Sequence, residues 1–352
     1  MAKRNSCICQ TIENTKHIII QKENAIISIA NSNKTFIFAI QKRNSMEIQY
    51  FDRWAIPYKG AKTWAYIVFN KYETELKRLD MSFQACKKYT FTSLKLKDKA
   101  QRNDIASLYL ETGGDNSITI QMWQNTFGKM FLNWHQLNKL MALSAYFETY
   151  IASIIHLIIE SNPSIILGIS KKIDGIQLCK AGETIPVDFT KDTIENCTKG
   201  EWPKRIASIK KLLLLKKDHY LSILLDKSVK ELECIRKMRN KVGHAFGRDI
   251  DDSRKWYETE TPKIDSLKEK RYLKWQKLIK SITRELDQYV IENHIGCFQE
   301  LFFYHSHLNE FDKSKDISQK AIILKEKLYE EKKLTYNKQF CKSLIDYYDN
   351  LT

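Results

Sequence analysis

Three apolar stripes with helical spacing constrain the fold of this chain more than any other feature. In each stripe, apolar residues recur three and four positions apart, which is the period of a helix buried along one side. The stripes comprise Leu137, Leu140, Met141, Ser144, Phe147, Ile151, Ile154, Ile155 and Ile158; then Leu221, Leu224, Leu225, Val229, Leu232, Ile235, Met238 and Val242; then Trp275, Leu278, Ile279, Ile282, Leu286, Tyr289 and Val290. They predict long helices that pack as an antiparallel bundle.

The segments around these stripes carry weaker signals. Asn162 and Pro163 predict the end of the first helix, because the residue before a proline disfavours helical geometry. The polar stretch 171–200 is typical of a loop or a small insertion, and Pro203 suits the first turn of a helix. The tail from 316 to 348 predicts one or two further charged helices docked on the bundle.

Upstream of about residue 123 the pattern changes to short runs of β-branched and aromatic residues, which favour strands. Turn residues separate several of the runs, such as the pair Gly113 and Gly114. The runs are HIIIQ, AIISIA, KTFIFAI, MEIQYF, WAYIVF, YTFTSLKL and SITIQMW. We therefore expect an α+β protein that is mainly helical, with a β-rich or mixed N-terminal domain before the bundle.

The length of 352 residues is enough for more than one domain, since single domains usually run to roughly 100–200 residues. We expect an N-terminal domain over 1–123 that senses a trigger or binds a partner. A helical domain over 124–300 and a C-terminal helical extension over 301–352 follow it. The aromatic and basic segment FDRWAIPYKGAKTWAY is a candidate sensing surface, although tryptophans in a small domain are more often core residues.

Charge and cysteine content limit the partners and the cellular compartment that we expect for this protein. The formal net charge of +16 favours a polyanionic partner, with nucleic acid as the first candidate, although excess lysine can also serve only to solvate a surface. The eight cysteines form no CxxC pair, which is typical of reduced thiols in the cytoplasm. The apolar run from Ile151 to Ile159 is shorter than the roughly 20 residues of a membrane helix, so we expect a soluble cytoplasmic protein.

The segment IRKMRNKVGHAFG, at the end of the second stripe, holds the main candidate site. It contains Arg239, Asn240 and His244 in an R-N-x-x-x-H arrangement. Arg239 lies on the apolar stripe, and a guanidinium there requires an anionic partner because an unpaired buried charge is costly. Five residues separate the arginine from the histidine, so on one straight helix their directions differ by about 140°.

Two interpretations of this segment remain open. Gly243 could end or bend the helix and let His244 approach Arg239, or a second copy of the chain could complete the site. Alternatively, Lys237, Arg239 and Lys241 could be an ordinary set of cations that complement the dipole at a helix C-terminus. The local sequence does not decide between these interpretations.

The helix order and the motif together resemble the HEPN family of helical domains over about residues 130–295. The resemblance rests on a long first helix with Phe147, Glu148 and Tyr150 in an F-E-x-Y pattern, and on a later helix that ends in RNKVGH. In that family an R-x-x-x-x-H motif with a polar residue after the arginine marks the catalytic members. Arg239, Asn240 and His244 match this motif.

The resemblance implies an endoribonuclease that needs no metal or other cofactor and leaves cyclic phosphate and 5′-hydroxyl ends. The residue chemistry agrees, because histidine can move a proton near neutral pH and arginine can bind a phosphate with two N–H groups. Asn240 would hold one of these groups or the phosphate. We expect Lys237 and Lys241 to contact the RNA.

Further expectations follow from the family alone. It implies a homodimer with two motifs facing one cleft, and an acidic residue near the cleft at the position of Glu148. It also implies a regulated toxin or effector in prokaryotic anti-phage defence by abortive infection, controlled by a regulatory protein or a phage-derived trigger. Two alternatives stay open: an inactive HEPN scaffold that binds nucleic acid, a nucleotide or a protein, and a module that binds nucleic acid through charge alone.

Other chemistries have little support. The chain has no P-loop, no dinucleotide-binding glycine motif and no nucleophile elbow. His294, Cys297, His305 and His307 are candidate zinc ligands, but their spacing matches no standard pattern. We therefore predict no metal site.

Overall fold

The computed structural model describes residues 51–95, 125, 128–311 and 315–351. The chain divides into two compact units, Met1–Tyr50 and Phe51–Thr352, and the described residues all belong to the second. Within these residues the regular structure is helical and contains no β-strand.

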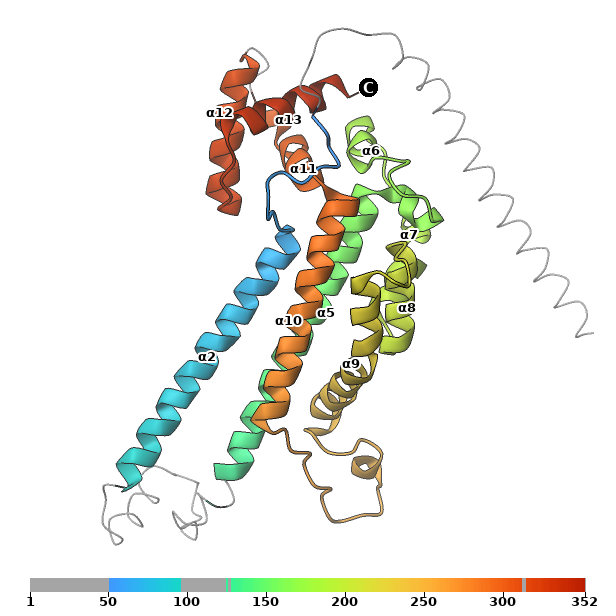
Figure 1. The fold of residues 1–352 in the computed structure, drawn as a ribbon. Coiled ribbons are helices and arrows are strands. Elements are labelled where there is room, and N and C mark those ends of the chain that lie inside the picture. Colours follow the sequence, from blue (N-terminus) through green and yellow to red (C-terminus); the bar gives the residue numbers. More distant parts are fainter. Residues whose placement is uncertain (1–50, 96–124, 126–127, 312–314, 352) are drawn as a thin grey trace, which may run out of the picture. The chain divides into compact units, whose positions relative to one another are not determined.

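Four long helices form the body of this unit (Figure 1). They are α2 (Trp64–Lys95), α5 (Gly128–Ser161), α9 (Tyr220–Ala245) and α10 (Glu269–Val290). Figure 1 shows that α2 and α9 run opposite to α5 and α10. Hydrogen bonds fix the parallel pair at both ends: Asn133 near the start of α5 bonds Leu267 before α10, and Ser161 at the end of α5 bonds His294 just after α10.

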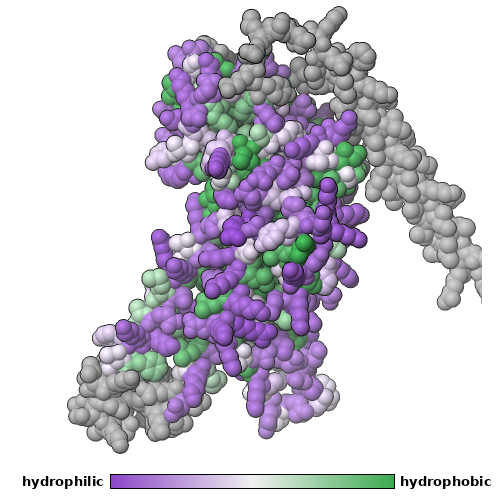
Figure 2. Space-filling view, in the orientation of Figure 1, coloured by the Kyte–Doolittle hydropathy of each residue, from purple (hydrophilic) through white to green (hydrophobic). Residues whose placement is uncertain are grey.

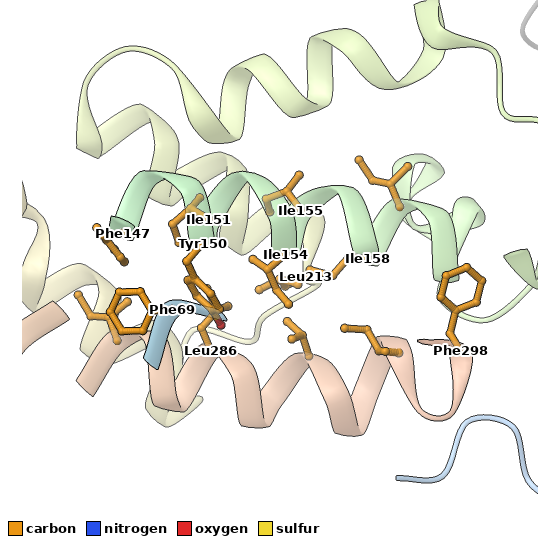
Figure 3. Packing of buried hydrophobic residues seen from close by; sticks show 14 of the residues in the cluster. Phe69, Phe147, Tyr150, Ile151, Ile154, Ile155, Ile158, Leu213, Leu286 and Phe298 are labelled. Atoms are coloured by element: carbon orange, nitrogen blue, oxygen red, sulfur yellow. The ribbon is translucent and has the colours of Figure 1, made fainter. Parts of the chain in front are cut away.

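The core is built around α5, whose apolar residues face all three of the other long helices. Leu140, Leu143, Ile154, Ile155 and Ile158 are completely buried. Figure 3 shows this face of α5 opposite α10, with Phe69 of α2 and Leu286 of α10 beside Tyr150. Each fully buried aliphatic side chain contributes about 1.5–3 kcal/mol. The stripe predicted from the spacing is therefore the face that holds the bundle together.

Shorter helices complete the unit. After α5 come the 3-10 helix η2 (Pro163–Leu167), α6 (Gly175–Ala181), α7 (Val187–Thr198) and α8 (Trp202–Leu212), and a 3-10 turn η3 (Asp252–Arg254) precedes α10. The π-helix η4 (Ile291–Ile295), α11 (Phe298–Ser306), the 3-10 turn η5 (Leu308–Glu310), α12 (Ile317–Lys327), the π-helix η6 (Leu328–Lys332) and α13 (Lys338–Asn350) follow.

The expectation of an α+β fold with a β-rich N-terminal region is wrong for the described residues. The runs WAYIVF and YTFTSLKL, apart from the last leucine, lie in helix α2. In WAYIVF the β propensity yields to tertiary packing, because Phe69 is buried on the face of α2 that packs against α5. The other runs lie outside the described residues, apart from Phe51, which is not in a strand.

The predictions downstream of α2 fare better. The helices at the three apolar stripes are confirmed, as are the end of α5 before Asn162, the start of α8 at Trp202 and the helices of the tail. Of the two possibilities predicted for 171–200, a loop or a small insertion, the loop is wrong, because α6 and α7 lie there. The Asp174 side chain accepts a hydrogen bond from the backbone N–H of Ile176 and so caps the start of α6.

Helix α5 is also long and apolar enough to cross a membrane by length and composition. Half of its most apolar window is buried inside the protein, and the core helix of a globular protein meets the same criterion. Figure 2 shows hydrophilic side chains over most of one face of the molecule, with hydrophobic patches between them. Length and composition alone therefore do not place α5 in a membrane.

Arg53 ties the segment before α2 to three other parts of the unit. Its side chain is buried, and Nε donates to Asp174 Oδ1 at 3.0 Å. Nη1 donates to the carbonyl of Ile295 at 2.7 Å, and Nη2 donates to the carbonyl of Ser161 at 2.7 Å. Burial lowers the pKa of Arg53, and the charge of Asp174 opposes this effect. Within the segment predicted as a sensing surface, this arginine is thus a structural residue.

Replacement of Arg53 by leucine should destabilise the protein by about 3–5 kcal/mol, because it leaves the carboxylate of Asp174 buried without its partner. Urea unfolding followed by circular dichroism measures this change. Arg254→Leu, at an exposed arginine, is the matched control and should shift stability by less than about 0.5 kcal/mol. Equal unfolding midpoints for the two variants would contradict this account of Arg53.

Candidate active site

The candidate motif lies in the last two turns of α9. This helix buries Leu221, Leu225, Leu232 and Ile235 against the bundle and continues without a break through Gly243 and His244. It ends at Ala245, and the left-handed backbone of the next residue, Phe246 (φ 54°), turns the chain away. The suggestion that the helix ends or bends at Gly243 is therefore wrong, since the chain leaves the helix through Phe246 and Gly247 instead.

Arg239 has the anionic partner that its position on the stripe requires. Its side chain is one third exposed (33%), and Nη2 lies 2.6 Å from Glu148 Oε2. Nη1 donates to Asn240 Oδ1 at 3.1 Å. The structure thus brings together Arg239, Asn240 and Glu148, which the sequence singled out separately. Because the guanidinium bonds these side chains, the contacts differ from those of an ordinary cap on the helix carbonyls.

A second arginine shares the same carboxylate. Arg205 of α8 is nearly buried, and its Nη1 lies 3.4 Å from Glu148 Oε1. Burial lowers the pKa of Arg205, Glu148 opposes this effect, and the positive charges of Arg236 and Arg239 add to it. Arg205 Nε has no hydrogen-bond partner among the described residues. Two guanidiniums on one carboxylate leave a local excess of positive charge.

Neighbouring charges hold α8 and α9 in register. Arg236 of α9 bonds Glu233 with both Nε and Nη2, and this pair raises the pKa of Arg236. Glu233 Oε2 also accepts a hydrogen bond from the backbone N–H of Trp202 in the first turn of α8, at 3.2 Å. The Trp202 ring stacks on Phe147 at 5.3 Å, one residue before Glu148. The contacts of Trp202 with Glu233 of α9 and with Phe147 of α5 therefore fix the position of Arg205 against Glu148.

His244 lies apart from this cluster within one chain. It is exposed, in the last turn of α9. Since the helix is continuous, the directions of Arg239 and His244 differ by about 140°, as the five-residue spacing requires. The tertiary structure thus unites Arg239, Asn240 and Glu148 and leaves the histidine facing elsewhere.

The two lysines predicted to bind RNA differ in their surroundings. Lys237 is exposed on α9. Lys241 Nζ lies 3.2 Å from both Asp249 and Asp265, and hydrogen bonds with these carboxylates raise its pKa. Because two acids already neutralise Lys241, Lys237 is the better placed of the two to attract a phosphate.

Sequence reasoning missed Arg205, for which the sequence contains only a weak signal, its spacing from Trp202. Arg205 follows the helix start at Trp202 by three residues, so it lies on the same face as that buried ring. The exposed aromatic residues Phe246 and Trp256, on the segment after the motif, were missed as well. Nothing in their local pattern distinguishes them from core residues.

Two of the candidate zinc ligands have other hydrogen-bond or ionic partners, and the other two are buried. His305 Nδ1 lies 2.5 Å from the hydroxyl of Tyr348, and His307 Nε2 lies 3.2 Å from Glu331. Burial lowers the pKa of His294 to about 4 and raises the pKa of the Cys297 thiol. Across residues 51–95, 128–311 and 315–351, no group of three or more His, Cys, Asp or Glu side chains could hold a metal ion.

Comparison with known proteins does not assign the chain to a family. No protein-family model matches the chain, and neither curated proteins nor solved structures show a significant similarity to it. The resemblance to HEPN domains therefore stays with the motif residues and the order of the helices, and the function it implies is a proposal.

Two buried carboxyl groups outside the motif were also not foreseen. Asp287 of α10 is fully buried, and Thr63 Oγ1 donates to its Oδ1 at 2.5 Å. Burial raises the pKa of Asp287 to about 7. Burial likewise raises the pKa of Glu300 to about 7, and this carboxyl accepts a hydrogen bond from Tyr336 at 2.6 Å.

Asp287 should make the protein less stable as the pH rises from about 4 to about 7. In this window the folded protein retains the proton of Asp287 and the unfolded chain releases it, so ionisation favours unfolding. We expect Asp287→Asn to remove this contribution to the pH dependence, so that the similar contribution of Glu300 remains, and to raise the thermal midpoint at pH 8. Melting curves at a series of pH values measure both effects. Exposed Asp188→Asn is the control, and identical pH profiles for the two variants would refute the role of burial.

Proposed function

We propose that this protein is a HEPN-type endoribonuclease that cleaves RNA without a metal ion. The observation that carries the proposal is the excess of positive charge at Glu148 of α5, whose one carboxylate is shared by Arg205 of α8 and Arg239 of α9. The last turn of α9 also presents His244 to solvent. A partly exposed guanidinium can bind a phosphate and stabilise negative charge as it develops in the reaction.

The proposed reaction needs only proton transfers and a strong anion-binding group. The ribose 2′-hydroxyl loses its proton and attacks the phosphorus, and the bond to the 5′ oxygen breaks as that oxygen gains a proton. The products are a 2′,3′-cyclic phosphate and a 5′-hydroxyl end. His244 moves one of these protons, Arg239 stabilises the phosphate, and Asn240 holds the guanidinium through its Oδ1. Glu148 is a positioning residue, because it acts on Arg239.

The geometry further supports a site shared between two copies. Within one chain the continuous helix directs Arg239 and His244 about 140° apart, so a cleft between two symmetric motifs is the arrangement that supplies both groups. We propose a cytoplasmic homodimer whose toxicity is held in check by a regulatory protein or a phage-derived trigger, as in abortive infection. This biological role rests on the resemblance to the family.

One observation favours an alternative, an inactive scaffold that binds nucleic acid, a nucleotide or a protein. Arg239 is already bonded by Glu148 and Asn240, and His244 is not directed toward it. A scaffold would use the same positive charge for binding only.

Incubation of the purified protein with total cellular RNA in excess EDTA tests the proposal. We expect the wild type to cleave RNA and His244→Ala to lose at least about a hundredfold in rate, since a positioned acid or base contributes roughly 10²–10⁴-fold. His156→Ala, at an exposed histidine of α5, is the matched control and should cleave normally. Mapping of the new ends should find cyclic phosphates. Intact RNA with all three proteins, under conditions in which they bind it, would favour the scaffold.

Mixing of two inactive variants tests whether the site is shared. In a mixed dimer of Arg239→Ala and His244→Ala, a site that takes one residue from each chain is restored once, whereas a site within one chain is never restored. We expect mixing with subunit exchange to recover about one quarter of the wild-type rate, because about half of the dimers are mixed and each has one working site. Recovery of no activity, with exchange verified by mass, would show that the two residues act within a single chain.

A further inference from the structure

An apolar groove of about 320 Å³ opens where the start of α5 meets the segment that follows α9. Figure 1 shows that these two segments lie at the same end of the bundle. About half of the surface of Met130, Phe131 and Phe246 is exposed (50%, 50% and 51%). The groove is lined by Met130, Phe131, Trp134, Leu137, Phe246 and Ile264. Exposed apolar side chains that gather in one groove, rather than lying scattered singly, are candidates for a binding surface.

The backbone at Phe246 is unfavourable for the residue that stands there. Its φ of 54° lies in the left-handed region, where a helix end usually carries glycine. Lys171, Leu214 and Lys333 have the same geometry, so it does not by itself mark a function, but it fixes the direction in which the chain leaves α9. The following Gly247 packs so closely that an added Cβ would lie 2.9 Å from Leu137 and 3.1 Å from Ile264. The Phe246 ring is thereby held at the groove, two residues after His244.

The charge around Phe246 favours an anionic ligand. Carboxylates pair with Arg236, Arg239 and Lys241, whereas Lys237 and Arg248 have no acidic partner among the described residues and so leave net positive charge on this segment. The guanidinium of Arg248 lies 5.7 Å from the centre of the Phe246 ring. A second copy of the chain carries the same positive charge, so electrostatics attract a polyanion to this wall of the groove more strongly than another protomer.

We propose that the groove binds an unpaired nucleobase of the RNA strand that the motif cleaves. This inference deepens the proposed function, and it rests on it. The rings of Phe131 and Trp134 stack at 5.8 Å and are nearly parallel (18°), so one wall is an aromatic platform. Stacking on aromatic rings accepts any base, and the apolar lining offers little hydrogen bonding to select one. Bases inside a duplex are already stacked, so the substrate class is single-stranded or looped RNA.

Binding, measured apart from cleavage, tests the groove. Each variant is made in the full-length His244→Ala protein, and its affinity for a fluorescein-labelled, unstructured RNA oligonucleotide is followed by fluorescence anisotropy. We expect Phe131→Ala and Phe246→Gly each to weaken binding about tenfold, since the loss of one base-stacking ring typically has this effect. Tyr329→Ala, at an exposed tyrosine of η6, is the matched control and should bind normally.

The salt dependence of binding separates stacking from charge. Loss of a ring should not change the slope of log affinity plotted against log salt concentration. Arg239→Ala should make this slope shallower by about one unit, the amount that corresponds to one phosphate contact. The same ring variants should not alter binding of the matching RNA duplex.

Phe246→Gly also distinguishes a binding role from a structural one. Glycine relieves the left-handed backbone, so we expect its thermal midpoint to stay level or to rise by about 1–3 °C while RNA binding falls. A loss of stability alone would indicate that Phe246 serves the fold.

The remaining outcomes overturn the inference in distinguishable ways. Equal RNA affinity for the ring variants and the control would reject the groove and leave the proposed ribonuclease untouched. If the ring variants sediment as monomers where the parent protein is a dimer, and the RNA affinity per protomer is unchanged, a second copy of the chain covers the groove. If the parent His244→Ala protein fails to bind any RNA, both the groove and the proposed function are wrong.

Discussion

Burial of the apolar face of α5 is the constraint on which the rest of the described structure depends. This one helix packs against α2, α9 and α10, and its fully buried residues, such as Ile154 and Ile158, leave no freedom in its rotation. Once that rotation is set, Glu148 has to emerge at the border of the core, because it directly follows the buried Phe147. The charged cluster is therefore positioned by hydrophobic packing.

The electrostatics of the cluster follow from this placement. A carboxylate at the border of a core attracts cations, and helices α8 and α9 each supply one, Arg205 and Arg239. The pair on Arg239 is partly open to solvent, so its contribution to stability is small compared with that of the buried pair at Arg53. In the proposed ribonuclease its role is to orient a guanidinium that remains one third exposed.

Periodicity predicted the helices wherever a stripe was long, as at α5, α9 and α10, since a run of several turns distinguishes a helix from a strand. It failed for α2, where short runs rich in β-branched and aromatic residues resembled strands. The absence of glycine and proline from 61 to 112 was the better signal. For the site, the requirement of a charged partner for Arg239 was predictable from its place on the stripe. The sharing of Glu148 with Arg205 was not, because 57 residues of chain separate these two side chains.

The sequence by itself determined that Arg239, Asn240 and His244 are candidate site residues and that one helix bears all three. The spacing of Arg239 and His244 is a local property, and a continuous helix turns it into a fixed angle. Only the tertiary structure decided that α9 remains helical through Gly243, that Arg205 joins the same carboxylate, and that Phe246 forms one wall of a groove with the start of α5. The physical reason is that local spacing sets the direction of a side chain from its own helix, whereas its partners depend on how distant helices pack.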